Sequence, residues 1–128
     1  MKLLLDTSIL IWAAGDILPS GAEDYILDEQ NELFFSPASI WEVVIKHSLG
    51  RSDFTVDPHL LYSSLSENGY TQIQIASKHV LLTGTLPLIH KDPFDRILLA
   101  QSIVEGISLL TSDEMIAKYP ASVIFVKK

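Results

Sequence analysis

The sequence predicts a three-layer α/β domain with a central parallel sheet of four to five strands flanked by helices. Short apolar segments typical of buried strands alternate along the chain with longer segments of helical character. Several helical segments begin and end at capping residues, such as Asp92-Pro93 at one start and Gly106 at the end of the same segment. With 128 residues and no repeat or long linker, the chain is expected to form one domain over residues 1–128.

In the first half of the chain, the elements are predicted from the points where polar residues, Gly and Pro interrupt apolar runs. Lys2–Leu5 is predicted to be a strand because it is apolar on both faces, as buried parallel strands are. Pro37 stands at the first position of a helix, and Gly50 and Gly69 close two helices. The predicted elements are a strand at 2–5, helices at 7–14 and 20–31, a strand at 33–35, a helix from 36 to 49, a loop at 51–56 and a helix from 57 to 68.

In the second half, the alternating run Thr71–Ile75 predicts a strand, and Asp92-Pro93 opens the clearest helix, which runs to Glu105. The predicted elements are a strand at 71–75, a helix at 77–84, a loop at 86–91, a helix from 92 to 105, a strand at 107–110, a short helix at 112–118 and a strand at 122–126.

Composition limits the function classes. The chain has no cysteine, which excludes disulfides and thiolate metal sites. Asp6 interrupts the N-terminal leucine run too early for a signal peptide, and no segment is long enough to span a membrane. We therefore expect a cytoplasmic protein with no membrane partner.

The formal net charge is −7, from 16 acidic and 9 basic residues. Such acidity argues against a nucleic-acid partner, because phosphate binding favours a basic face. The objection weakens if several carboxylates bind divalent cations, which would reverse the local potential. The alternative is that the acidity only keeps the protein soluble.

Four acidic residues stand out because each follows an apolar strand or lies in a largely apolar helix, whereas most other acids lie in plainly polar stretches. A carboxylate among apolar residues must be paired, protonated or metal-bound. The four are Asp6, Glu42, Asp95 and Asp113. Asp6 and Asp113 follow predicted strands, at the end where open α/β sheets bind ligands.

Each of the four also has a structural alternative. Asp6 and Asp113 stand where helix-capping residues are expected, and for Asp6 taken alone the cap is the favoured interpretation. Glu42 could complete a capping box with Ser39 or pair with Lys46 one turn later. For Asp95 the alternative is a dipole-favoured acid, although Asp92 already explains the cap.

If these acids converge at one edge of the sheet, they form an oxygen-only donor set without His or Cys. Such a set suits Mg²⁺ or Mn²⁺ rather than Zn²⁺. These ions bind substrate phosphates and lower the pKa of bound water, which is the chemistry of phosphodiester hydrolysis.

Four blocks of sequence occur in an order and spacing found in a known family. The blocks are Leu4-Leu5-Asp6-Thr7-Ser8, Ser36–Glu42 with Lys46 and Gly50, Asp92–Gln101, and Leu110–Asp113. The sequence resembles PIN-domain proteins, and specifically the VapC-type toxins of bacterial toxin–antitoxin pairs. The Asp92-Pro93-Phe94-Asp95-Arg96 run is the most specific part of the resemblance.

The resemblance implies a Rossmann-like PIN fold and a ribonuclease that uses Mg²⁺ or Mn²⁺ at Asp6, Glu42, Asp95 and Asp113. It also implies an RNA substrate, a homodimer and a cognate antitoxin protein. Thr7 and Thr111 match positions that provide hydroxyl support around the acids. Asp92 is favoured as a cap, with outer metal ligand as the alternative, and Arg96 either steadies phosphate or pairs with Asp92 to hold the loop.

The histidines, the basic residues and the aromatic residues carry separate expectations. No general base is predicted, because neither His47 nor His90 lies in a motif position. Lys46, Arg51 and Lys91 could form a local basic rim that offsets the acidity. The aromatic residues Trp12, Trp41 and Phe94 are expected in the core, and any left exposed would suit an antitoxin groove.

Two other function classes are alternatives to a metal-dependent nuclease. A receiver-like domain phosphorylated at Asp6 fits poorly, because the late strand lacks the lysine that such domains need. The second alternative is a catalytically inactive PIN-like binding module that acts only through protein partners. The choice of RNA cannot be predicted, since loop and rim residues determine it.

Overall fold

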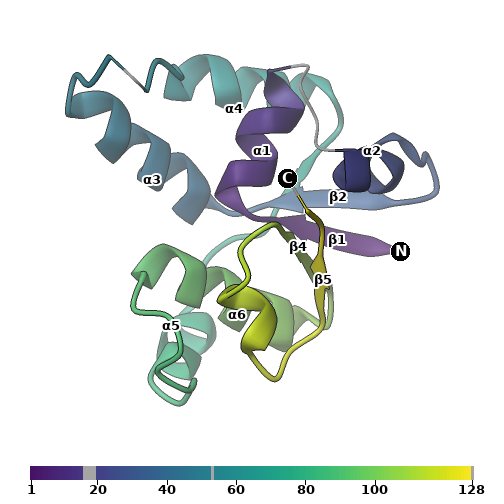
Figure 1. Cartoon of the computed structure of the whole chain (residues 1–128), viewed down its shortest axis with the longest axis vertical. Coiled ribbons are helices and arrows are strands. Elements are labelled where there is room, and N and C mark those ends of the chain that lie inside the picture. Colours follow the sequence, from purple (N-terminus) through teal and green to yellow (C-terminus); the bar gives the residue numbers. More distant parts are fainter. Residues whose placement is uncertain (16–19, 53, 128) are drawn as a thin grey trace.

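The computed structural model describes residues 1–15, 20–52 and 54–127 (Figure 1). Position 53 of the predicted loop at 51–56 lies outside these residues. The helices are α1 (Thr7–Ala14), α2 (Ser20–Leu27), α3 (Pro37–Ser48), α4 (Pro58–Glu67), α5 (Ser77–Thr83), α6 (Pro93–Glu105) and the 3₁₀ helix η1 (Ile116–Lys118). The strands are β1 (Lys2–Leu5), β2 (Glu32–Phe35), β3 (Thr71–Gln72), β4 (Ser108–Thr111) and β5 (Val123–Phe125).

The five strands form one parallel sheet in the order β3-β2-β1-β4-β5. β1 lies at its centre, where Leu4 pairs with Phe34 of β2 and with Leu109 of β4. Leu3, Leu4 and Leu5 are all fully buried, as expected for a central strand covered on both faces. The predicted three-layer α/β class with a parallel sheet is confirmed.

Helices cover both faces of the sheet and create two cores (Figure 1). Leu3 and Leu5 point into the first core, together with buried residues of α1, α2, α3 and α4. Leu4, which alternates with them, points into the second core with Leu98 and Leu99 of α6. Figure 1 shows the first group of helices above the sheet and α5 with α6 below it.

Two predicted elements are shorter than expected at their C-terminal ends. The helix predicted at 20–31 ends at Leu27, because the Asp28 side chain accepts the Gln30 N–H at 2.9 Å and replaces the helical pattern with a turn. The strand predicted at 71–75 is limited to Thr71–Gln72, since the carbonyl of Ile73 accepts from the Gln101 side chain at 3.1 Å.

The short helix predicted at 112–118 is a single 3₁₀ turn, Ile116–Lys118. Pro120 explains its early end, because the residue before a proline avoids the helical region, and Tyr119 is extended with φ −78° and ψ 149°. Within the described ranges, no helix combines the length and apolarity that a membrane crossing requires.

Gly106 ends α6 in the left-handed region, with φ 68° and ψ 34°. A Cβ atom at this position would meet nothing within 4 Å, so the backbone conformation alone opposes substitution. We expect Gly106→Ala to lower the free energy of unfolding by about 1–2 kcal/mol, measured by urea denaturation.

Gly84 provides the matched control, because it has φ −70° at the end of α5. Its added Cβ would lie at an ordinary contact distance of 3.5 Å from the Leu81 carbonyl oxygen. Gly84→Ala should therefore leave the protein equally stable or slightly more stable. Equal losses in the two variants would contradict this account.

Candidate active site

The candidate site lies where two neighbouring parallel strands end and two helices pass over them. Asp6 follows β1, and Asp113 lies two residues beyond β4. Glu42 comes from α3 and Asp95 from the first turn of α6, and these two helices pack against each other. Residues separated by more than one hundred positions in sequence are thereby brought to one edge of the sheet.

Asp6 is buried, and both of its carboxylate oxygens have protein partners. Oδ1 accepts the Ile9 N–H at 2.9 Å, which confirms the cap of α1. Oδ2 accepts a short hydrogen bond from the hydroxyl of Thr111. Asp6 therefore caps α1 through Oδ1 and contacts the residues around the other acids through Oδ2.

Thr111 connects two of the four acids. Its hydroxyl donates to Asp6 and accepts the backbone N–H of Asp113 at 3.0 Å. Thr7, which was expected in a similar role, donates instead to the Ser39 hydroxyl at 3.0 Å and links the end of β1 to α3. Hydroxyl support around the acids thus comes from Thr111, while Thr7 orients the helix that holds Glu42.

Glu42 is more than nine-tenths buried and is only half satisfied. Its Oε2 lies 2.9 Å from Lys46 Nζ, so the pairing with Lys46 is present. The capping box with Ser39 is absent, because Ser36 caps α3 by accepting the Ala38 N–H at 3.1 Å. Oε1 of Glu42 is buried and has no hydrogen-bond partner among the residues that the structure describes. Leaving such an oxygen unpaired is costly.

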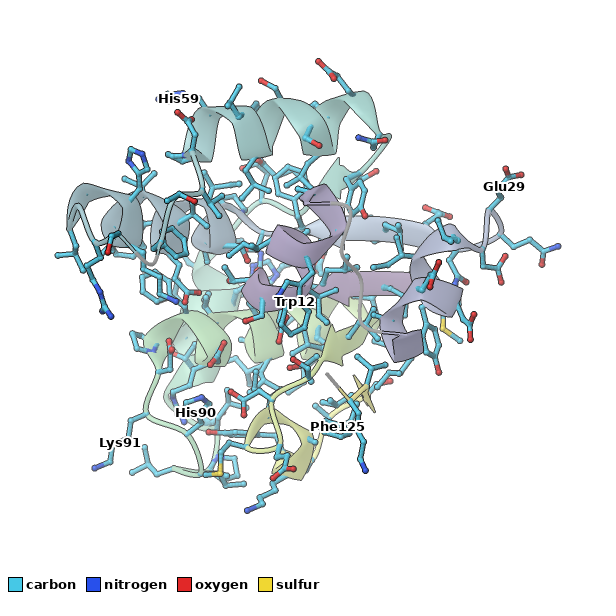
Figure 2. All side chains as sticks on the ribbon, turned by 45° about the horizontal axis from the view of Figure 1, so that its top comes forward. Trp12, Glu29, His59, His90, Lys91 and Phe125 are labelled. Atoms are coloured by element: carbon cyan, nitrogen blue, oxygen red, sulfur yellow. The ribbon has the colours of Figure 1, made fainter. Side chains whose placement is uncertain are left out.

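His90 lies among the acids, and sequence reasoning missed it. Its Nε2 is 2.9 Å from Oδ2 of Asp95 and 3.3 Å from Oδ2 of Asp113. The expectation that no histidine accompanies the acids is therefore not met. Figure 2 labels His90 and Lys91 on the loop that leads into α6. That loop returns across the start of the helix, and the short distance in sequence between His90 and Asp95 was the one available signal.

Proximity and burial change the acidity of two carboxyls. Burial raises the pKa of Asp6 to about 6, against hydrogen bonds from Thr111 and Ile9 that lower it. Burial also raises the pKa of Asp95 to about 8, and the charges of Asp92, Asp6, Glu42 and Asp113 add to the shift. The contact between Asp95 Oδ2 and His90 Nε2 contains one proton, and the tautomer of His90 decides which of the two atoms carries it.

Asp92 and Arg96 build the loop beside the site. Asp92 caps α6 by accepting the N–H groups of Phe94 at 2.8 Å and Asp95 at 3.4 Å, which confirms the cap. Among the described contacts, Arg96 does not pair with Asp92. Its guanidinium donates to the carbonyls of Pro87 at 2.9 Å and His90 at 3.4 Å, to two further carbonyls and to the Tyr119 hydroxyl. It therefore holds the loop, through the backbone rather than through Asp92.

A shallow hollow adjoins the acids on the outer side of α3. Lys46 and Lys91 line it together with Phe94 and Glu42. Trp41 is 63% exposed and packs edge-on against Phe94, with ring centroids 5.2 Å apart. The expectation that Trp41 lies in the core is wrong, whereas Trp12 packs against the first core. Two lysines, the exposed Trp41 and the half-buried Phe94 thus flank the acids.

Comparisons with known proteins identify a family. The PIN domain family model matches residues 3–121. No curated protein sequence matches the chain. Among solved structures, similar chains occur in VapBC2 from Rickettsia felis bound to a promoter DNA fragment and in a toxin–antitoxin complex from Klebsiella pneumoniae.

The structural likeness extends over nearly the whole length of the chains compared. The Rickettsia felis chain has a TM-score of 0.68 and 17% identity, covering 99% of this chain and 98% of that chain. The Klebsiella pneumoniae chain has a TM-score of 0.65 and 20% identity, covering 98% of this chain and 99% of that chain. A chain of DNA-bound VapBC from Salmonella typhimurium has a TM-score of 0.68 and 14% identity, covering 98% of each. At these identities the likeness establishes a common fold.

The raised pKa values predict how stability depends on pH. The folded state holds protons on Asp6 and Asp95 that the unfolded chain, with carboxyl pKa near 3.8, releases. In EDTA, stability should therefore fall as pH rises from about 4 to about 8. Melting temperatures in EDTA at pH 5 and pH 8 measure the loss.

Two substitutions test whether the pH dependence of stability arises at the candidate site. Asp95→Asn should flatten the pH dependence, because an amide does not titrate. Asp28→Asn, in an exposed turn, should leave it unchanged. A melting temperature of the unaltered protein that increases between pH 5 and pH 8 in EDTA would be incompatible with buried, mutually repelling carboxyls.

The contacts of Arg96 predict that lysine cannot replace it. A single ammonium group cannot reach acceptors arranged around a planar fork, so Arg96→Lys should lower the free energy of unfolding by roughly 2–3 kcal/mol. Tyr119→Phe, which removes one hydroxyl of the same network, should cost about 1 kcal/mol. Urea denaturation measures both, and an Arg96→Lys variant as stable as the parent would exclude the loop-holding role.

Proposed function

The chain belongs to the PIN domain family, and we propose that it is a divalent-metal-dependent endoribonuclease, the toxin of a type II toxin–antitoxin pair. PIN domains are generally nucleases. The proposal treats residues 1–128 as one catalytic domain with its site at Asp6, Glu42, Asp95 and Asp113.

The observation that supports this function most directly is the grouping of the four carboxylates. Asp95 is acted on by the charges of the other three, and Asp6 by those of Glu42 and Asp113. Glu42 meanwhile keeps one buried oxygen without a partner in the described part of the chain. Uncompensated negative charge and an unsatisfied acceptor are the features that a bound divalent cation would relieve.

These residues fit a divalent ion, and we assign Mg²⁺ or Mn²⁺ to them. Such an ion would lower the pKa of water and offset charge on a phosphodiester. Thr111 keeps Asp6 and Asp113 together, and the Asp92 cap fixes the helix start that presents Asp95. Lys46 orients Glu42 through its second oxygen. The protein's own contribution is thus to hold the acids in place before substrate arrives.

RNA would approach over the hollow beside the acids. Lys46 and Lys91 offer positive charge there, which answers part of the objection raised by the net charge of −7. Trp41 and Phe94 present aromatic surface suited to unstacked bases of single-stranded RNA. The proposed substrate is therefore RNA with accessible single-stranded positions.

A cognate antitoxin and a second copy of the chain are the proposed protein partners. Large apolar side chains are exposed on α3, at its C-cap residue and on α4, including Trp41 at 63%, Leu49 at 63% and Leu60 at 70%. Exposed apolar surface of this kind favours protein partners. The neighbours in Rickettsia felis and Klebsiella pneumoniae are themselves described as VapBC or toxin–antitoxin complexes.

The function predicts loss of cleavage when one acid is neutralised. Purified protein with Mn²⁺ should cut RNA, and cutting should stop in EDTA. Asp95→Asn should reduce the rate at least about a hundredfold, because even residues supporting a metal ligand commonly contribute ten- to a hundredfold. Gel analysis of a mixed RNA pool measures the rate, with Asp28→Asn as the matched control.

Three results would contradict the proposal. Cleavage that persists in EDTA would exclude metal dependence. An Asp95→Asn variant as active as the parent would remove the assigned site. A folded protein that cuts no RNA in the pool, and binds its antitoxin, would favour the inactive binding module.

A further inference from the structure

His90 brings a nitrogen donor to a group of oxygens. Its Nε2 and one carboxylate oxygen each from Asp95 and Asp113 all lie within 4.8 Å of one another. The two shorter separations are 2.9 Å to Asp95 and 3.3 Å to Asp113. Neighbouring ligands of an octahedral ion with bonds of about 2.1 Å stand about 3.0 Å apart. The observed spacing therefore matches that of adjacent metal ligands.

Hydrogen bonds alone also produce such distances, so the support around His90 matters. The Tyr119 hydroxyl accepts the backbone N–H of His90 at 2.7 Å and donates to the carbonyl of His90 at 3.1 Å. Arg96 reaches the same carbonyl at 3.4 Å and the same hydroxyl at 3.2 Å. Both backbone polar groups of His90 are thus fixed, and Tyr119 itself is 4% exposed. This arrangement fixes the backbone from which the imidazole reaches Asp95 and Asp113.

Glu42 gives independent evidence that the site is built for a cation. The residue is 8% exposed, and its Oε1 has no partner in the described ranges. Its charge acts on both Asp6 and Asp95, which places it beside the same cluster. A nine-tenths-buried acceptor at the cluster indicates a ligand there, since polar atoms at such depth are otherwise satisfied.

We propose that His90 binds the divalent ion through Nε2, together with Asp95 and Asp113, and that this nitrogen makes the site favour Mn²⁺ over Mg²⁺. Mg²⁺ takes oxygen ligands almost exclusively and holds its waters, whereas an imidazole nitrogen suits transition metals. The inference rests on the proposed metal-dependent function and specifies which ion that function uses.

Pulsed electron paramagnetic resonance of the Mn²⁺-loaded full-length protein tests the ligand directly. A nitrogen bound to Mn²⁺ couples to the electron spin, and labelling the histidines with ¹⁵N identifies the coupled atom as histidine nitrogen. We expect a coupling in the parent and in His59→Gln, and none in His90→Gln. His59 is an exposed histidine on α4, distant from His90 in Figure 2.

Calorimetric titration tests the preference between the two ions. His90→Gln should weaken Mn²⁺ binding about tenfold or more and change Mg²⁺ binding less than about threefold. His59→Gln should change neither affinity. If His90→Gln fails to fold, the labelled parent protein still tests the inference, because among the described residues His90 is the only histidine in a group that could hold a metal ion.

Absence of histidine-nitrogen coupling in the parent would overturn the inference. Equal weakening of Mg²⁺ and Mn²⁺ binding in His90→Gln would also overturn it, because His90 would then only hydrogen-bond the carboxylates. These results leave the nuclease proposal standing if cleavage remains metal-dependent. By contrast, a parent protein that binds neither ion would refute the metal site itself, and the inference with it.

Discussion

The structure depends on keeping four carboxylates close together in a partly buried place despite their mutual repulsion. Two adjacent parallel strands, β1 and β4, determine the positions of Asp6 and Asp113, and the hydroxyl of Thr111 joins them. Repulsion and burial appear as raised pKa values at Asp6 and Asp95. This cost fits the proposed divalent cation, which would supply the positive charge that the protein's own contacts provide only in part.

Each residue of the Asp92-Pro93-Phe94-Asp95-Arg96 run has a different structural role. Asp92 caps α6, Pro93 occupies its first turn, and Phe94 packs against Trp41. Asp95 enters the acid cluster, while Arg96 turns to the other side and binds carbonyls of the preceding loop. That loop in turn positions His90. The motif therefore encodes one local structure in which helix start, loop and acid are placed together.

The overall acidity and the proposed RNA substrate are compatible because the relevant potential is local. Much of the negative charge lies in solvated turns and helix faces, such as Glu29, which projects from the end of the molecule opposite His90 in Figure 2. Lys46 and Lys91 are instead gathered beside the acids. A cation held by the acids would strengthen that contrast, since bound divalent ions are the largest charges near such sites.

The sequence by itself determined the fold class and most element positions, and it singled out the four acids of the proposed site, because these follow from local apolar periodicity, caps and a contiguous motif. The sequence did not predict that His90 lies among the acids, that Trp41 is exposed, or that Arg96 binds backbone carbonyls. Nor could it reject the capping box of Glu42, which Ser36 displaces by capping α3. Only the tertiary structure decided these points, since each depends on which side chains meet across α3, α6 and the loop between α5 and α6. These contacts arise from the packing of separate elements on the sheet, and they cannot be predicted from local sequence.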